Sequence, residues 1–369
     1  MKTIITFFLS GFVLLFTASC QQQKVSTTVT ETKTAGVSAT TFGPFKTNYS
    51  FDGRCNGDSV YHERQGQIAE YVRRVFQDNR GGLLFGTNGE GIAHYDGVVL
   101  EYFTTADGLA GNQVTAIMEG KEGHLLIATD GGISKYEAGK FHNYTTKHGL
   151  NNNYVWSLFQ DSKGTLWAGT VEGLCRFDGT KFQTVTIPLS IAKNPEASFS
   201  INRICHIMED SKGNLWIASD GRGAYKYDGK KYTNYTTDDG LCDNNITCIE
   251  EDKKGNIWFG SMYGGISKYD GNTFINYNQS NSIGNNEVWE ILTDKQGYVW
   301  FSSEGYGVYR YNGREFENYG EKQGLGVRAV QTIFEDHQGR IWTGGGGGLY
   351  QFMGDGFMNV RKDGPWDGC

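Results

Sequence analysis

Proline is scarce in this sequence, and so are the residue patterns that mark common catalytic sites. Only 4 of the 369 residues are proline, whereas 52 are glycine and the aromatic residues comprise 22 Phe, 21 Tyr and 8 Trp. This balance is typical of many short strands joined by tight turns. The sequence holds no Gly-x-Ser-x-Gly elbow, no His-Glu-x-x-His pair and no phosphate-binding loop. The commonest hydrolase, metalloprotease and nucleotide-hydrolase motifs are therefore missing.

An excess of positive charge and paired cysteines are missing as well. The formal net charge is -7 and the pI is about 5.6, whereas nucleic-acid binders usually carry a basic surface. We therefore expect no nucleic-acid partner. Without a Cys-x-x-Cys pair, neither a zinc site nor another cofactor is indicated. Four cysteines inside the repeats described below are expected to be small buried core residues: Cys175, Cys205, Cys242 and Cys248.

Long apolar runs are confined to the N-terminus. The run 4–16 precedes the small residues Thr17 to Ser19 and then Cys20; it is short for a membrane span and has the form of a signal peptide. We expect residues 1–19 to be a lipoprotein signal peptide and Cys20 to carry the lipid anchor, with plain cleavage after Ser19 as the alternative. The Gln-, Thr- and Ser-rich segment 20–41 predicts a flexible tether. The expected location is the outer membrane, facing the periplasm, with the lipid as the only membrane contact.

Seven copies of one pattern fill most of the chain. The stretch from Asp210 to Trp216 reads Asp-Ser-Lys-Gly-Asn-Leu-Trp, and related stretches recur with steps of 42, 41, 49, 42, 42 and 42 residues between their turn glycines: Gly81, Gly123, Gly164, Gly213, Gly255, Gly297 and Gly339. A fixed period of this length indicates a propeller or another array. We predict one seven-bladed propeller over residues 68–361, with an N-terminal extension at 42–67 and a tail at 362–369.

Each repeat predicts four antiparallel strands, so the fold class is all-β. In the fourth copy the strands are 204–208, 215–218, 225–227 and 232–235, and Asp228-Gly229 is expected to form a two-residue hairpin. A closed ring buries each blade against its neighbours and leaves only short sheet edges. Recurrent large residues are expected to fill the wedges between blades: Trp167, Trp216, Trp258, Trp300 and Trp342, with Leu84 and Leu126 in the first two blades.

The repeat resembles a known family. It reads Gly-Leu-x-x-Asn-x-Val, then Glu-Asp-x-x-Gly-x-Leu-Trp-x-Gly-Thr, then Gly-Leu-x-x-Tyr-Asp-Gly, with instances at 149–155, 209–216 and 173–179. This pattern is similar to the two-component regulator propeller repeat of bacterial sensor proteins. The resemblance implies the extracytoplasmic part of a histidine kinase, and several such propellers sense oligosaccharides released from complex polysaccharides.

The chain departs from that arrangement after the repeats. It ends at Cys369, and no membrane helix, kinase or DNA-binding segment follows the last blade. We therefore expect a stand-alone ligand-binding propeller outside the membrane. Its protein partner would be a separately encoded sensor kinase or another envelope protein.

The repeats also predict which face binds the ligand. If the first strand of each blade lies innermost, the Asp-x-x-Gly turns and the Asp-Gly hairpins share one face, which we call the stereotyped face. The links between blades and the turns between second and third strands share the other, the variable face, and such loops are the better place for a site. Trp156 and Trp289 lie there at an inner-strand position that would favour small residues, and other candidates lie nearby: Arg203, Glu287, Arg222, Met262, Tyr263, Glu304 and Tyr306.

Aromatic rings beside charged groups suit an oligosaccharide or another small polar ligand. The alternative is that the two tryptophans only plug the centre of the ring. A further set of residues precedes the inner strands, and five of its members are asparagines that are expected to cap the local backbone: Asn112, Asn153, Asn202, Asn244 and Asn286. Glu70 and Arg328 break this pattern, so they are the better candidates for ligand contacts.

Two other functions stay open. Propellers serve as rigid platforms, so a protein-interaction scaffold in the cell envelope is one. The second is a lyase or hydrolase, by analogy with seven-bladed streptogramin lyases, in which His206 would act with Glu287 or Glu290 as acid and base.

The joins of the ring carry further predictions. The link 184–200 makes its repeat seven residues longer than the usual 42, and we expect this link to close over the ligand. Blades 1 and 7 each have four strands of their own, so side-chain packing alone is expected to hold the join between them. Cys55 and Cys369 flank that join, and we hypothesise a disulfide between them, with two free thiols as the alternative. The disulfide would stabilise the fold by about 5 kcal/mol in the chain-entropy model.

Overall fold

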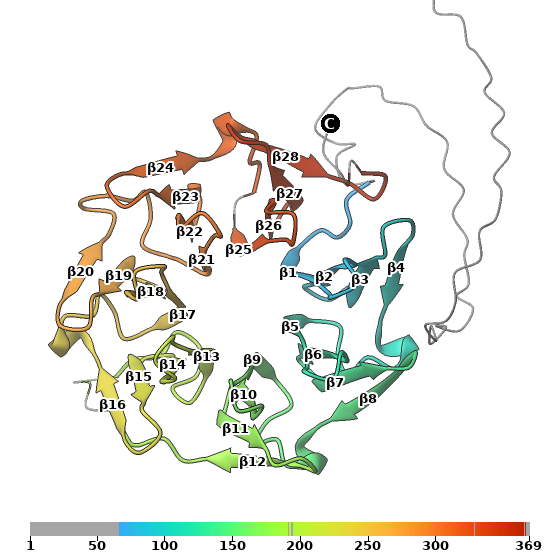
Figure 1. Cartoon of the computed structure of the whole chain (residues 1–369), viewed down its shortest axis with the longest axis horizontal. Helices are drawn as coiled ribbons and strands as arrows, with labels where there is room; N and C mark the ends of the chain where they lie inside the picture. Colours follow the sequence, from blue (N-terminus) through green and yellow to red (C-terminus); the bar gives the residue numbers. More distant parts are fainter. Residues whose placement is uncertain (1–65, 191, 193–194, 328, 365, 367–369) are drawn as a thin grey trace, which may run out of the picture. The chain divides into compact units, whose positions relative to one another are not determined.

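The computed structural model describes residues 66–190, 192, 195–327, 329–364 and 366, which form seven four-stranded antiparallel sheets arranged in a ring (Figure 1). The seven-bladed, all-β prediction is confirmed. The predictions for the signal peptide, the tether, Cys20, Arg328 and the disulfide concern residues outside the described ones, and they stay predictions. Within the described residues, no helix has the length and apolar character of a membrane span.

The blades follow one another in chain order, and the first strand of each lies innermost (Figure 1). The first three blades are β1 (Val72–Gln77), β2 (Leu83–Thr87), β3 (Ile92–Tyr95) and β4 (Leu100–Phe103); β5 (Val114–Glu119), β6 (Leu125–Thr129), β7 (Gly132–Glu137) and β8 (Lys140–Tyr144); β9 (Val155–Gln160), β10 (Leu166–Thr170), β11 (Gly173–Phe177) and β12 (Phe182–Val185).

The last four blades are β13 (Ile204–Glu209), β14 (Leu215–Ser219), β15 (Ala224–Tyr227) and β16 (Tyr232–Tyr235); β17 (Ile246–Glu251), β18 (Ile257–Ser261), β19 (Ile266–Tyr269) and β20 (Phe274–Tyr277); β21 (Ile291–Thr293), β22 (Val299–Ser303), β23 (Gly307–Tyr311) and β24 (Phe316–Tyr319); β25 (Val330–Glu335), β26 (Ile341–Gly345), β27 (Gly348–Phe352) and β28 (Phe357–Val360). The strands predicted for the fourth copy agree with β13 to β16 to within one residue.

The two-residue hairpin predicted at Asp228-Gly229 is wrong, although blade 2 has a two-residue loop between the paired residues Glu137 and Lys140. Tyr227 pairs with Tyr232, so the loop of blade 4 contains four residues. The Asp228 carboxylate accepts hydrogen bonds from the backbone N–H groups of Lys230 (2.8 Å) and Lys231 (2.9 Å), and Gly229 has a φ of 91°. The loop is therefore closed by an aspartate side chain, which is a second reason for the recurrence of the Asp-Gly pair.

In blades 3 to 7 an aspartate at the first turn also holds the wedge tryptophan of its own blade. Six residues separate the partners, and the indole Nε1–H donates to the carboxylate in five blades, at 2.9, 2.8, 2.9, 2.8 and 2.8 Å: Asp161–Trp167, Asp210–Trp216, Asp252–Trp258, Asp294–Trp300 and Asp336–Trp342. The same carboxylates accept backbone N–H bonds within the turn. One side chain therefore fixes both the turn and the rotamer of the core residue.

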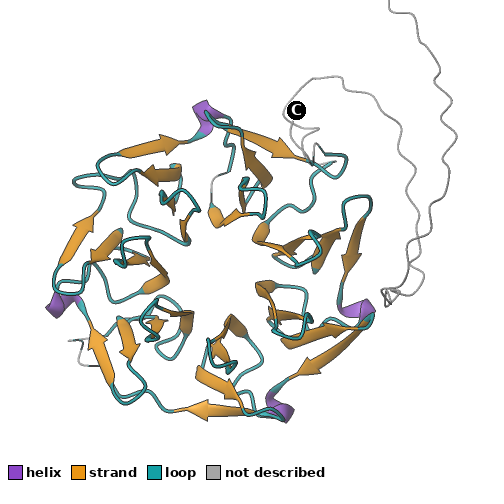
Figure 2. Ribbon diagram, in the orientation of Figure 1, coloured by secondary structure: helices purple, strands orange, loops and turns teal. Residues whose placement is uncertain are grey.

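The wedges between blades are filled as the sequence predicts. The five tryptophans and both leucines are at most 8% exposed. Five links each add a buried aliphatic residue to the wedge between the two blades that they connect: Leu109, Leu150, Leu241, Ile283 and Leu325. Four of these links contain short helical turns at the rim (Figure 2): η1 (Thr105–Asp107), η2 (Thr146–His148), η3 (Thr237–Asp239) and η4 (Glu321–Gln323). Cys175, Cys205 and Cys248 are buried as predicted, whereas Cys242 is partly exposed.

The join between blades 1 and 7 is not held by side-chain packing alone, and that prediction is wrong. Lys362 N–H donates to the Gly66 carbonyl (2.8 Å) and Gly347 N–H donates to the Glu70 carbonyl (3.1 Å). Gln67 forms a backbone bridge with Arg361. The segment before β1 thus runs antiparallel to the end of blade 7, and backbone hydrogen bonds contribute to ring closure.

Removing one turn aspartate tests the coupling of turn and wedge. Asp294 is 5% exposed and accepts bonds from Gln296 N–H, Tyr298 N–H and Trp300 Nε1–H. Asp294→Ala leaves these donors without partners, and we expect it to lower the free energy of unfolding by about 2–4 kcal/mol. Asp228→Ala is the matched control, because that exposed aspartate caps only a loop. Urea denaturation of both variants measures the difference, and equal losses would contradict the coupling.

Candidate functional site

Trp156, at the start of β9, is the centre of an aromatic and basic cluster on the variable face. The guanidinium carbons of Arg203 and Arg73 lie 4.6 and 5.2 Å from the centroid of its ring, and the Tyr154 ring centroid lies 5.5 Å away. Arg73 belongs to blade 1 and Arg203 precedes blade 4. Side chains from non-adjacent blades therefore meet on the axis of the ring. The Trp156 side chain is partly exposed, and two arginines pack against its ring.

The charge of Arg203 is neutralised within the protein. Its Nη2 lies 2.9 Å from the buried carboxylate of Asp220, and that carboxylate also accepts backbone bonds from Ser198, Phe199 and Ser200 at 2.8, 2.8 and 3.0 Å. The end of the long link is thus tied to the turn of blade 4. Phe199 at this end of the link packs against Tyr154, which itself contacts Trp156, and the expectation that the link closes over a ligand stays a prediction.

Arg73 is the site residue that was not selected as a candidate from the sequence. Its Nη1 donates to Asn88 Oδ1 (3.0 Å), and no carboxylate among the described residues pairs with it. Burial, followed by the nearby charge of Arg74, lowers the pKa of its guanidinium from the usual value. The sequence does contain a signal for this residue, because Arg73 is the one arginine at the repeat position that Trp156 and Trp289 occupy in other blades. A half-buried cation without an acidic partner favours an anionic ligand group.

Carboxylates line the opposite side of the axis. Glu287 Oε1 accepts a hydrogen bond from Trp289 Nε1–H (2.8 Å), and Glu304 donates its backbone N–H to the Glu287 carbonyl (3.0 Å). Burial and the nearby Glu287 raise the pKa of Glu304 to about 7. Burial raises the pKa of Tyr71, Arg73 lowers it, and Glu304 and Glu287 raise it further. The Tyr71 hydroxyl therefore interacts electrostatically with both the basic and the acidic side of the site.

Three exposed aromatic side chains lie farther out on the variable face. Phe199, Tyr263 and Tyr306 are 63%, 61% and 48% exposed, and they belong to the links or turns of blades 4, 5 and 6. The Tyr306 ring packs against Gly284, where an added Cβ would lie only 2.2 Å from the ring. One ring face is therefore held by the backbone, and the side chain is fixed before any ligand arrives.

The remaining candidates have local roles. Four asparagines accept a hydrogen bond from the backbone N–H seven residues earlier, at 2.9, 2.8, 3.0 and 2.7 Å, as the capping interpretation predicts: Asn112, Asn153, Asn244 and Asn286. Asn202 differs, because it accepts a bond from Arg222 Nη2 (3.2 Å) and donates to Glu172 (3.1 Å). Glu70 is exposed, and its backbone N–H donates to Glu90 Oε1 (3.2 Å).

Below these residues the axis is filled by buried ionisable groups. Arg74 Nη1 lies 3.4 Å from Glu290 Oε2 and donates to the Gln331 carbonyl (2.8 Å). Burial raises the pKa of Glu290 to about 7 although Arg74 opposes the shift. Burial also raises the pKa of Glu250 to about 8. At neutral pH the Glu250 carboxyl is therefore mostly neutral and the Glu290 carboxyl is about half neutral, which reduces the cost of desolvating them.

The structure does not assemble the acid and base pair of the enzyme alternative. His206 Nδ1 accepts the backbone N–H of Ile249 (3.3 Å). Burial, followed by the charge of Arg74, lowers the pKa of this histidine to about 4. No hydrogen bond joins His206 to Glu287 or Glu290 among the described residues. Catalytic hydrogen bonds often form only once the substrate is bound, so the enzyme alternative stays a prediction.

One group of potential metal ligands lies on the stereotyped face. Donor atoms of Glu122, His124 and Glu137 lie within 4.8 Å of one another. Both carboxylates are exposed, and Glu137 pairs with Lys135 at 3.0 Å. These three side chains therefore form a solvated cluster on the protein surface.

The buried carboxyls predict a pH dependence of stability. The pKa of Glu250 is raised from 4.5 to about 8 in the folded chain, so the folded state holds this proton more tightly than the unfolded state. Stability from this group is highest at acidic pH and falls as the pH rises from 4.5 towards 8. We expect Glu250→Gln to flatten this decline by roughly 1–3 kcal/mol in the free energy of unfolding.

Urea unfolding between pH 5 and pH 8 measures this effect. Glu321→Gln, at an exposed position in η4, is the control and should retain the wild-type slope. Parallel curves for wild type and Glu250→Gln would contradict the assignment of the neutral carboxyl.

Comparison with known proteins agrees with the fold. A family model described as "Two component regulator propeller" matches residues 149–172, 198–221, 240–263 and 282–305, which lie in the repeats. A search of curated protein sequences finds no match.

Solved structures share the architecture. The extracellular domain of a B. thetaiotaomicron protein described as a one component system is 25% identical with a TM-score of 0.50, and the match covers 78% of this chain and 43% of that one. Virginiamycin B lyase from Staphylococcus aureus is 13% identical with a TM-score of 0.59, over 77% and 95% of the chains. PorZ, a surface component of the type-IX secretion system of Porphyromonas gingivalis, is 17% identical with a TM-score of 0.60, over 79% and 48%. The last two likenesses show the fold alone, and the chain spans less than half of the first-mentioned relative.

Proposed function

The chain carries two-component regulator propeller repeats, and from this premise we propose that it is an extracytoplasmic sensor-type propeller that binds an oligosaccharide or a similar polar ligand on its variable face. The ligand would lie over the axis, between the basic side at Arg73 and the acidic side at Glu287 and Glu304. Signalling would need a separate partner protein, such as a sensor kinase encoded elsewhere.

The distribution of exposed aromatic rings carries this proposal. Among the described residues, the exposed large hydrophobic side chains include three aromatics, and all three lie on the variable face: Phe199, Tyr263 and Tyr306. Sugar rings have apolar faces that pack on aromatic rings and hydroxyl edges that need polar partners. Arg73, Glu304 and Tyr71 offer such partners a short way towards the axis. Glu304, with a pKa near 7, would both donate and accept hydrogen bonds at neutral pH.

The solved relative supports the sensor part of the proposal. It is the extracellular domain of a protein described as a one component system, so its repeats lie outside the membrane. We propose the same location for this chain, with export by the signal peptide at 1–19 and anchoring through a lipid on Cys20. The ligand of that relative is a separate question, because the match covers only 43% of its chain.

A thermal-shift screen tests ligand binding. We expect at least one of a panel of neutral, sulfated and uronic-acid oligosaccharides to raise the unfolding temperature of the wild type. Tyr263→Ala and Tyr306→Ala should each weaken that ligand about tenfold, since loss of one stacking ring costs about 1 kcal/mol or more. Trp156→Ala and Trp289→Ala should abolish binding, because they disrupt both sides of the axis.

The controls separate a ligand site from a platform. Val98→Ala, at an exposed position on the stereotyped face, should leave the shift unchanged. A panel without any positive ligand, together with co-purification of an envelope protein, would favour the scaffold function. Shifts that persist in all four aromatic variants would place the sugar elsewhere on the protein.

The lipid anchor has its own test. Cys20→Ala should move the protein from the membrane fraction to the soluble extracytoplasmic fraction, because one residue provides the whole membrane attachment. Metabolic labelling with a fatty acid should mark the wild type and not the variant. A membrane-bound, unlabelled wild type would contradict acylation at this cysteine.

A further inference from the structure

In three wedges, a tyrosine from the fourth strand stacks on the wedge tryptophan of the same blade. The ring centroids are 5.5, 6.1 and 5.9 Å apart, with interplanar angles of 26°, 16° and 27°, in the pairs Trp216–Tyr235, Trp258–Tyr277 and Trp300–Tyr319. A buried leucine or isoleucine from the next link completes each of these wedges. The face of each tryptophan is thus covered by the protein itself.

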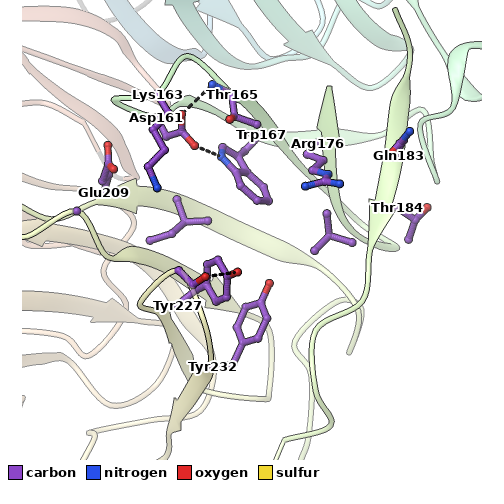
Figure 3. Close-up of a pocket in the computed structure, with 14 residues that line it drawn as sticks. Asp161, Lys163, Thr165, Trp167, Arg176, Gln183, Thr184, Glu209, Tyr227 and Tyr232 are labelled. Carbon is purple, nitrogen blue, oxygen red and sulfur yellow. Dashed lines mark hydrogen bonds between the residues drawn. The ribbon is translucent and has the colours of Figure 1, made fainter. Parts of the chain in front are cut away.

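The wedge between blades 3 and 4 lacks the stacking tyrosine, and its link contributes the partly buried Ile187 in place of a fully buried aliphatic residue. Val185 occupies the position of the stacking tyrosine, as its pairing with Leu174 shows. Phe199 holds the repeat position of that aliphatic residue and is 63% exposed on the variable face. The result is a cavity of about 330 Å³ that opens towards the stereotyped face, away from the site proposed above. Its walls include Trp167, Tyr227 and Tyr232 (Figure 3).

The wedge between blades 7 and 1 shows what such a space accepts. Val360 occupies the tyrosine position there too, as its pairing with Leu349 shows. In that wedge Trp366, from the segment after β28, packs into the core cluster. Its ring stacks on Tyr95 with centroids 4.1 Å apart and an interplanar angle of 16°. Tyr95 holds the repeat position of Tyr227, so a ring from outside the four strands fills the equivalent space.

A cation without an acidic partner lies at the edge of the empty wedge. Arg176 lines the cavity (Figure 3) and pairs across strands with Gln183. In blade 6 the corresponding pair is Arg310 and Glu317, which form an ion pair. Gln183 Nε2 instead donates to Asp178 (2.7 Å), and no salt bridge involves Arg176 among the described residues. The substitution of glutamate by glutamine leaves this guanidinium available to a ligand.

The two carboxylates of the cavity are already bound within the protein. Asp161 accepts bonds from Thr165 N–H (2.7 Å) and Trp167 Nε1–H (2.9 Å). Glu209 accepts bonds from the backbone N–H and the hydroxyl of Ser162 at 2.6 and 2.9 Å. Lys163 also lines the cavity, beside these two carboxylates (Figure 3). An anionic ligand group would be directed to the other end of the cavity, where Arg176 has no carboxylate paired with it among the described residues.

We propose that the wedge between blades 3 and 4 is a second ligand site, which takes a single six-membered ring that carries an anionic group. The ring packs between Trp167 and the tyrosines of blade 4, in the space that a tyrosine fills in other wedges, and the anion pairs with Arg176. A volume of about 330 Å³ is at the small end of ligand sites, which fits one ring and not an oligosaccharide. An aromatic carboxylate and a uronic acid share this chemistry.

Calorimetric titration of the full chain with 4-hydroxyphenylacetate and with glucuronate tests the site. We expect one of the two to bind, and the one that binds identifies the source of the ring. Tyrosol and methyl glucoside, which lack the anion, should bind at least tenfold more weakly. Val185→Tyr rebuilds the stacking pair of the other wedges, so it should abolish binding while the unfolding temperature stays the same or rises.

Two further variants locate the effect. Arg176→Gln should weaken the anionic ligand about tenfold and leave the neutral analogue unchanged, whereas Lys226→Gln, at the same repeat position of blade 4, should have no effect. Trp156→Ala should also leave this binding unchanged, so that failure of the variable-face site and failure of this one are distinguishable. The proposal is overturned if neither anionic ring binds the wild type at millimolar concentration, or if Arg176→Gln binds as well as the wild type.

Discussion

The hydrogen bond between a turn aspartate and a wedge tryptophan is the interaction on which the rest of this propeller depends. Asp210 and Trp216 are only six residues apart, yet their bond of 2.8 Å ties a surface turn to the core between two blades. A buried indole N–H without an acceptor would be costly, so the aspartate is required wherever the tryptophan is buried. The repeat of one turn motif along the chain thereby repeats one wedge around the ring.

Departures from that repeat create the features with functional potential. Where blades keep the stacking tyrosine and the aliphatic residue of the link, the wedge is closed and has only a structural role. Val185 and Phe199 replace these groups at the junction of blades 3 and 4, and a cavity remains there. Val360 makes the same replacement at the junction of blades 7 and 1, but Trp366 fills that space and contributes to ring closure.

The axis follows a different rule, because it gathers side chains from several blades in one small volume. The half-buried carboxyls of Glu250 and Glu290 have raised pKa values there. Desolvation penalises their charge more than hydrogen bonds from Thr293 compensate for it at Glu250, and more than Arg74 compensates for it at Glu290. Nearer the variable face the same crowding separates a basic side at Arg73 from an acidic side at Glu304. This polarity is a property of the assembled ring, and no single repeat contains it.

The sequence by itself determined the number of blades, the strands to within about a residue in the fourth copy, and the tryptophans of the core. These features depend on contacts within one repeat of about 42 residues, where Asp, Gly and Trp have fixed spacings. Comparing one repeat with another also selected the variable face and residues such as Trp156, Tyr263 and Tyr306 as ligand-site candidates, and their role in binding stays a proposal.

Only the tertiary structure decided which residues meet across repeats. It placed Arg203 and Arg73 over the ring of Trp156, and it placed the segment at Gly66 beside the end of blade 7. These contacts join residues that lie up to about 300 positions apart, and no local spacing encodes them. Ring closure brings them together, because each blade can bury its faces only against its neighbours.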